Sequence, residues 1–126
     1  METVYIAPTA QGTGDGSSAA NAYAYSSLSS AESDAGSGGI ILFLDGTYTV
    51  GGNSWDNGSH SDMTYKSLND GGAYLFSSGI LSLTIGPSSG TATTKLEGFK
   101  AANIYYIAGS GSTAITLNKI RHADTV

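Results

Sequence analysis

The sequence places Leu83-Thr-Ile85 and Leu96-Glu-Gly-Phe99 ahead of a similar pair of runs, Tyr105-Tyr-Ile107 and Leu117-Asn-Lys-Ile120. An interval of about 22 residues separates the first runs of the two pairs, and it falls among the repeat lengths of solenoid proteins. The interval between the second runs is shorter by one residue, and glycine and serine separate the runs at corresponding places. A spacing shared by two runs is typical of a solenoid, in which stacked coils bury one another's inward side chains.

The longer of the two intervals, here called the period, also extends toward the N-terminus. It links Ile41, Met63, Ile85 and Ile107, and it links Tyr74 to Leu96. We therefore predict an all-β fold, a right-handed parallel β-helix of about four coils stacked about 4.8 Å apart. An antiparallel sandwich is the alternative, because it also has short strands joined by turns, but it gives no reason for a shared register.

The composition supports short strands and narrows the possible partners. Only 12% of the residues are charged, and 18 of the 126 are glycine, which favours tight turns. A net charge of -5 with five cations argues against nucleic acid. There is no cysteine, no apolar run long enough to insert into a membrane and no visible signal peptide. We expect neither nucleic acid nor membrane insertion.

The chain divides into two regions. Residues 1–39 are predicted to form an N-terminal cap, with a strand at 3–7, a glycine-rich loop and a short helix within 25–35. Residues 40–126 are predicted to form the coils, with a loop excursion at 51–62. The residues at 40–44 form a continuous apolar run, and both faces of this strand are expected to be buried at its start, because the helix would stack over the end of the core.

The cap also carries a family resemblance. The runs that carry it are Val4-Tyr-Ile-Ala-Pro8, Gly12-Thr-Gly-Asp-Gly-Ser17, Ala22-Tyr23 before Ser26, and Gly39-Ile-Ile-Leu-Phe-Leu-Asp-Gly-Thr-Tyr48. Together they resemble the N-terminal cap of pectate-lyase-like right-handed β-helix proteins. The resemblance covers residues 3–50, and the later coils resemble the family only in their period. The family includes polysaccharide lyases and hydrolases, bacterial surface proteins, and bacteriophage tailspikes and fibres, so the resemblance implies an extracellular or virion location.

The excursion holds the first candidate site, formed by Trp55, Asp56, His60 and Asp62. An exposed tryptophan beside carboxylates suits stacking on a sugar ring, because indole offers apolar area at little entropic cost. In the alternative interpretation, Trp55 folds back and seals the side of the core. The spacing of the other three residues matches no specific ligand pattern, so we predict no metal site.

A second candidate is a row of charged residues. Lys95 and Glu97 flank Leu96, whereas Lys119 and Arg121 flank Ile120. Both pairs are expected to point outward and to stack as neighbours, forming either a solvated salt-bridge ladder or a weak contact for an acidic sugar.

The tyrosines at 48, 65, 74 and 105 lie at strand positions and are predicted to pack in the core.

No catalytic group is evident. Polysaccharide lyases of this fold resemble one another in gathering aspartates for Ca²⁺ and a Lys or Arg base, whereas the acids after the cap are spread singly here. We expect a non-catalytic structural or attachment module without a cofactor, part of a phage fibre, tailspike or bacterial surface protein, whose ligand is a glycan. The alternative is an N-terminal fragment of a polysaccharide lyase or glycoside hydrolase, with Ca²⁺ possible.

The last predicted coil has no capping helix after it. An uncapped solenoid end exposes unpaired backbone groups and apolar side chains. The sequence therefore predicts self-association, or another chain docking on the C-terminal end.

Overall fold

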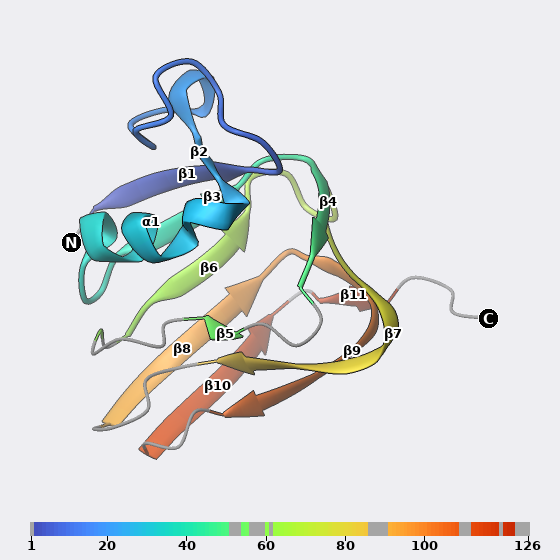
Figure 1. Cartoon of the computed structure of the whole chain (residues 1–126). Coiled ribbons are helices and arrows are strands. Elements are labelled where there is room, and N and C mark those ends of the chain that lie inside the picture. The colour runs from blue at the N-terminus through green and yellow to red at the C-terminus, as the bar shows by residue number, and fades with distance from the viewer. Residues whose placement is uncertain are drawn as a thin grey trace.

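The structure of the chain is a computed structural model that describes residues 2–50, 54–55, 60, 62–85, 91–108, 112–118 and 120–122. For residues 78–82, 91–92, 102–108, 112–115 and 121–122 it describes the backbone alone. The described part is mostly β, with parallel sheets and little helix (Figure 1).

The region predicted to be the cap contains the elements expected of it. In chain order these are β1 (Thr3–Ala7), η1 (Ala19–Asn21), β2 (Tyr23–Ala24), η2 (Tyr25–Ser27) and α1 (Leu28–Ala35). The helix ends at Gly36, whose φ of 69° is a backbone conformation that glycine adopts without a steric penalty. The strand predicted at 3–7 and the helix predicted within 25–35 are thus confirmed.

The remaining strands lie in two sheets, here called sheet A and sheet B, and the chain passes repeatedly from one to the other. Sheet A adds β3 (Ile40–Phe43), β6 (Thr64–Ser67), β8 (Thr91–Glu97) and β10 (Ser112–Asn118) to β1 and β2. Sheet B contains β4 (Gly46–Thr49), β5 (Ser54–Trp55), β7 (Ala73–Ile85), β9 (Lys100–Ala108) and β11 (Arg121–His122).

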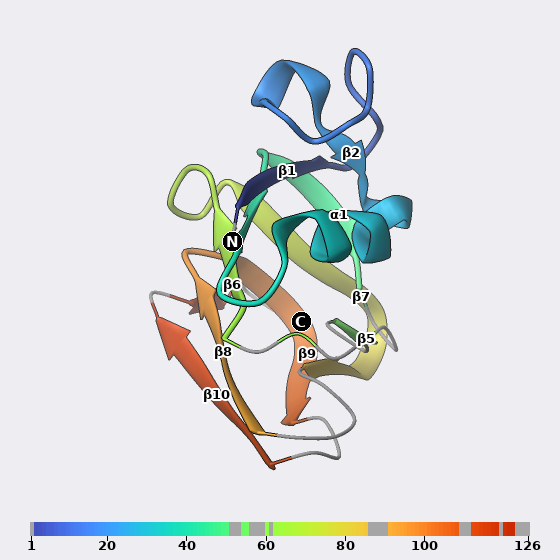
Figure 2. The same ribbon diagram turned by 90° about the vertical axis from the view of Figure 1, so that its left-hand side faces the viewer.

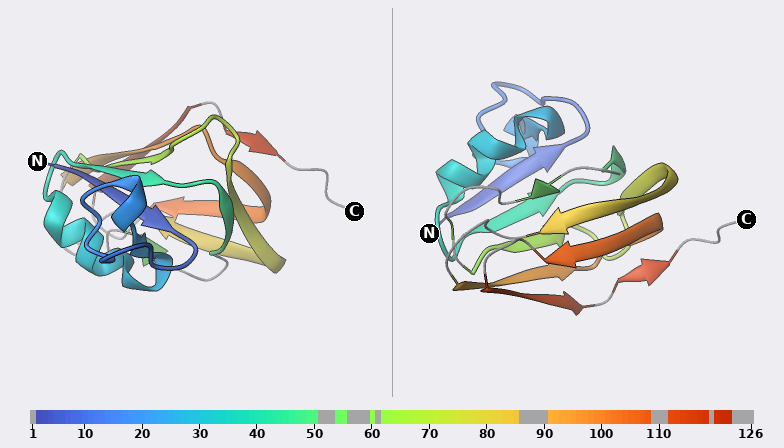
Figure 3. Two further views of the ribbon diagram at one scale, coloured as in Figure 1. Left: turned by 90° about the horizontal axis from the view of Figure 1, so that it is seen from above. Right: turned by 60° about the horizontal axis from the view of Figure 1, so that its bottom comes forward.

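The strand order is β10-β8-β6-β3-β1-β2 in sheet A and β11-β9-β7-β4 in sheet B, where β5 also pairs with β7. Figure 2 shows β6, β8 and β10 along one side of the molecule and β7 on the other, and Figure 3 shows the strands lying one above the next. Every strand pair in the described part of the chain is parallel. The alternative of an antiparallel sandwich is therefore wrong.

One row of paired residues runs through sheet A from its first strands to its last. Val4 pairs with Ile41, Ile41 with Tyr65, Tyr65 with Leu96, and Leu96 with Leu117. The first four side chains are at most 3% exposed and belong to the core. The predicted pairing of Leu96 with Leu117 is confirmed. We call these five residues the inward row.

The period does not hold in the middle of the chain. Ile41 pairs with Tyr65 rather than with Met63, which precedes β6 but is still buried. Tyr74 pairs with Lys100 of β9, not with a residue of β8. These two predicted pairings are wrong, because the number of residues between paired positions differs from one pair of strands to the next.

The pairing of β7 with β9 shows where the length changes. Their register shifts between Phe76 and Leu81, where β7 uses more residues than β9. Beyond the shift, Ile85 pairs with Ala108, so Ile107 is one residue out of the predicted register. A slip of one residue exchanges the two faces of a strand, so a fixed period cannot assign inward positions here.

The helix α1 lies on the inner side of β1 and β3, where its buried residues Leu28, Ala31 and Ala35 join the core. It covers the end of the core and leaves the outer surface of sheet A open. Burial along β3 therefore alternates, with Ile41 and Phe43 fully buried and the intervening apolar residues half-buried. The prediction that both faces of this strand are buried at its start is wrong for this reason.

Candidate functional site

Trp55 lies inside the protein. Its side chain is 0% exposed and stacks between two rings, with centroid distances of 5.1 Å to Phe43 and 4.9 Å to Tyr65. The indole Nε1 donates a hydrogen bond of 2.8 Å to the hydroxyl of Tyr25, so its polar atom is satisfied. Stacking of Trp55 on a sugar is therefore ruled out, and the alternative, in which Trp55 seals the core, describes the structure.

The structure places two of the other three residues of that candidate site. Asp56 lies outside the described residues, and His60 is half-buried. Asp62 is exposed, and its φ of 57° is unusual for a residue with a side chain. Its carboxylate accepts a 3.1 Å hydrogen bond from the backbone N–H of Thr93, which ties the segment before β6 to β8.

The charged row is split between the two sheets. Lys95 and Glu97 lie on the outer surface of sheet A, where Glu97 pairs in register with Lys66 and Asn118. The side-chain amide of Asn118 donates a 3.1 Å hydrogen bond to Glu97. After Glu97 the chain turns at Gly98, whose φ is 77°, and enters sheet B.

Arg121 therefore belongs to sheet B, where it pairs in register with Lys100. The expectation that it stacks beside Glu97 is wrong, because the turn between the sheets separates the two positions. Lys119 lies outside the described residues.

A half-buried aromatic pair lies on the outer surface of sheet B. Along β7, Ala73, Leu75 and Ser77 are buried, while Tyr74 and Phe76 point outward and are half-buried. The two rings lie 6.0 Å apart at 67° in an edge-to-face arrangement. The predicted core position of Tyr74 is therefore wrong.

The other predicted core tyrosines differ in outcome. Tyr48 and Tyr65 are buried, as predicted, and the hydroxyl of Tyr48 donates a 2.6 Å hydrogen bond to the carbonyl of Leu44. For Tyr105 the structure describes the backbone and not the side chain.

A lysine and two threonines complete the exposed surface around the rings. The Nζ of Lys100 lies 5.5 Å from the centroid of the Tyr74 ring, a cation–π distance. Thr47 pairs in register with Tyr74, and Thr49 with Phe76, and both threonines are exposed. We call Thr47, Thr49, Tyr74, Phe76 and Lys100 the aromatic face.

The aromatic face combines three kinds of contact on one rigid surface: ring area, an ammonium group and hydroxyls. The strands of sheet B contain no Asp or Glu, although the chain as a whole has a net charge of -5. Sequence reasoning missed this surface because Ala73-Tyr-Leu-Phe76 is apolar at every position, so alternation could not assign its faces. The only available signal was the pair Thr47 and Thr49, which flank buried Tyr48.

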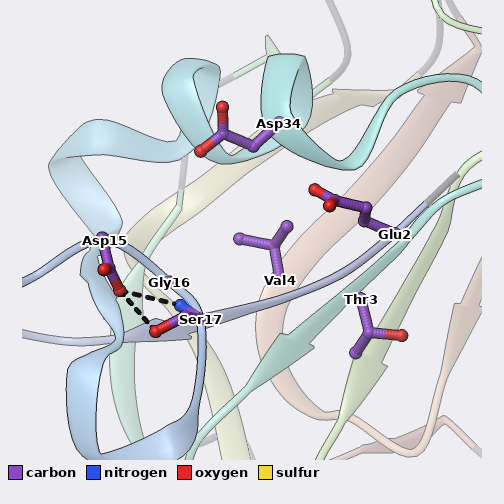
Figure 4. A pocket seen from close by; sticks show the side chains of 7 residues that line it. All are labelled: Glu2, Thr3, Val4, Asp15, Gly16, Ser17 and Asp34. Atoms are coloured by element: carbon purple, nitrogen blue, oxygen red, sulfur yellow. Dashed lines mark hydrogen bonds between the residues drawn. The ribbon is translucent and has the colours of Figure 1, made fainter.

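A polar cavity of about 340 Å³ opens between the glycine-rich loop, β1 and α1 (Figure 4). It is lined by Glu2, Thr3, Val4, Asp15, Gly16, Ser17 and Asp34.

Two of the cavity's carboxylates already accept hydrogen bonds from residues of the N-terminal region. Asp15 accepts hydrogen bonds from the backbone N–H and the hydroxyl of Ser17, at 3.0 and 2.6 Å, which lower the pKa of Asp15. Asp34 accepts a hydrogen bond from Tyr23, which raises the pKa of that phenol. We therefore interpret the cavity as part of the cap's structure.

The described residues contain no group of three His, Asp or Glu side chains suited to a metal ion. No helix within the described ranges has the length and apolar character needed to span a membrane. Comparison of the chain with known protein families, curated proteins and solved structures finds no match.

Proposed function

We propose that the chain is a right-handed parallel β-helix that serves as a non-catalytic attachment module and contacts glycans through the aromatic face. In this proposal it is a structural part of a phage fibre, a tailspike or a bacterial surface protein, and it works outside the cell or on a virion. It needs no cofactor.

The path of the chain supports the β-helix. Parallel neighbours need a long crossover, which is usually a helix. Here the crossover between strands of sheet A contains a strand of sheet B. The strand β3 leads to β4, β6 to β7, β8 to β9, and β10 to β11. After each of the first three pairs the chain returns to sheet A. Only Leu44 and Asp45 separate β3 from β4, and only Gly98 and Phe99 separate β8 from β9. Crossovers between parallel strands are right-handed in nearly all proteins, which supports the hand.

The observation that carries the glycan proposal is the outward position of Tyr74 and Phe76 beside Lys100. Half-exposed rings on a strand are held rigidly, so a flat, partly apolar ligand can stack on them with little loss of conformational entropy. A sugar ring has such a face, and its hydroxyls can bond to the lysine and to the exposed threonines. The absence of carboxylates from the strands of sheet B leaves the surface open to neutral and acidic glycans.

The test is a binding measurement against a panel of immobilised neutral and acidic polysaccharides. For a glycan that the wild-type chain binds, Tyr74→Ala should weaken binding about tenfold, equivalent to about 1.4 kcal/mol. Tyr5→Ala is the matched control, because Tyr5 is also half-buried in a strand but lies on sheet A. Equal losses for the two variants, or no binding by the wild type, would contradict the proposal.

The enzyme alternative is tested with the same panel in solution, with and without Ca²⁺. A non-catalytic module should leave the chains intact. New unsaturated or reducing ends in proportion to the amount of protein would replace the attachment role with that of a lyase or a hydrolase.

A further inference from the structure

The strand β10 is the last strand in the order of sheet A. All of its residues pair with β8, from Ser112 with Thr91 to Asn118 with Glu97, without any irregularity. On its other side, β10 has no strand partner among the described residues. A regular edge of this kind presents a row of backbone donors and acceptors to any strand that can approach it.

The side chain of Leu117 is exposed at this edge. Leu117 pairs with Leu96 in the inward row, and paired residues of a parallel ladder face the same side. Leu96 is 0% exposed, whereas Leu117 is 47% exposed. The difference arises because β10 covers Leu96 and no described strand covers Leu117.

The sequence of β10 does not protect the edge. Isolated edge strands usually carry a charge, a proline or a bulge that prevents pairing with another chain. The strand reads Ser-Thr-Ala-Ile-Thr-Leu-Asn and has none of these. Threonine, isoleucine and leucine favour extended pairing.

The opposite end of sheet A is closed. It finishes on β2, which has only two residues, and α1 packs against the inner side of β1 there. A second copy therefore cannot add its β10 to the other end of the stack. An interface that can form at only one end of each molecule must use the same surface on both copies.

We infer that a second copy of this chain pairs edge to edge with β10 in antiparallel orientation about a two-fold axis at Ile115, the middle residue of the strand. The dimer joins the two copies of sheet A and covers Leu117 of each copy. The pairing brings no charged residues opposite one another, because β10 has none. It is independent of glycan binding and is tested without a glycan.

The first test is the mass in solution over a wide range of concentration. The wild-type chain should give a species of twice the mass of one chain, which dissociates on dilution. Leu117→Lys should be monomeric, because an inward-pointing lysine blocks an edge and the exposure of this position lets the side chain reach water. Thr93→Lys, at an exposed position of β8, is the control and should remain dimeric.

Circular dichroism should show that both variants stay folded. A wild-type chain of single mass at every concentration would overturn the inference, including the case in which residues after β11 cover Leu117. Assemblies larger than a dimer would also overturn it.

A second test uses the absence of cysteine from the chain. Ile115→Cys would place two thiols across the two-fold axis, where opposed Cα atoms of an antiparallel pair lie within the range of a disulfide. This variant should form a covalent dimer on mild oxidation much faster than Thr93→Cys. Equal rates for the two variants would contradict pairing through β10.

Discussion

The aromatic residues of this protein occupy two regions with opposite environments. In the aromatic core, six rings pack against one another behind the sheets: Tyr25, Phe43, Tyr48, Trp55, Tyr65 and Phe99. On the aromatic face, Tyr74 and Phe76 contact each other and a lysine at the surface. Aromatic side chains thus stabilise the core in the first region, and they are partly accessible at the surface in the second. The environment of a ring depends on whether its side chain points into the core or toward the surface.

Replacement of Trp55 should give the largest effect on stability. Trp55→Ala removes a fully buried ring that stacks on Phe43 and Tyr65. We expect a loss of about 3–5 kcal/mol in the free energy of unfolding, which combines lost burial with the cost of a cavity. Urea unfolding followed by circular dichroism measures this loss. A loss below about 1 kcal/mol would mean that the indole is not part of a packed core.

Tyr65→Phe should have a smaller effect, because it keeps the ring and removes one hydrogen bond. The Tyr65 hydroxyl donates a 2.5 Å hydrogen bond to the carboxylate of Glu32, a buried residue of α1. Removing a donor from a buried carboxylate should cost about 1–3 kcal/mol. The double variant with Glu32→Gln should lose less than the sum of the two single variants, because the two groups interact. Additive losses would show that the bond contributes nothing.

The buried rings should also make stability depend on alkaline pH. Burial raises the pKa of Tyr25 from 10.0 to about 12. The folded state therefore holds this proton more tightly, so stability is fully present below pH 10 and falls as the pH rises from 10 to 12. Tyr25→Phe should be less stable at neutral pH, because the indole N–H loses its acceptor, but should show a shallower alkaline decline. An unchanged slope would contradict this assignment.

Tyr74→Ala should have the smallest effect on folding. Because the ring is outward and half-buried, we expect a change of no more than about 0.5 kcal/mol, measured by the same urea titration. The variant should nevertheless bind glycan about tenfold more weakly, so folding and binding would separate at this position. A loss of stability similar to that of Trp55→Ala would place Tyr74 in the core and remove the distinction between the two regions.

Lys100→Ala, compared with Lys95→Ala on sheet A, sharpens the same comparison. Both lysines are exposed, but only Lys100 lies over an aromatic ring. We expect only Lys100→Ala to weaken glycan binding, severalfold at most. Equal binding by both variants would confine recognition to the rings.

The sequence could predict strand pairing where the spacing between paired residues matches the spacing seen in the sequence pattern. Leu96 and Leu117 pair as their spacing in the sequence indicates, and the strand and helix of the cap lie where local patterns place them. The turns before β8 have unequal lengths, and the extra residues of β7 between Phe76 and Leu81 shift the register. Because a shift of one residue exchanges the faces of a strand, periodicity alone could not show which apolar residues point inward.

The candidate site depended on the same decision and was therefore less predictable. The polar neighbours of Trp55 in the sequence left both an exposed and a buried indole open, and the pairing of β5 with the end of β7 is what brings the indole into the core. Tyr74 looked buried because its neighbours are apolar. In both cases the composition around a residue was a poor guide, because its environment is set by strands distant in the sequence.

The order of pairing in sheet A also bears on how the chain acquires its structure. Each strand of sheet A from β3 onward pairs with a strand of that sheet that precedes it in the sequence: β3 with β1, β6 with β3, β8 with β6, and β10 with β8. During synthesis, the pairing partner of each new strand of this sheet has therefore already been made. Sheet A can therefore form strand by strand during synthesis, beginning at the end that α1 covers.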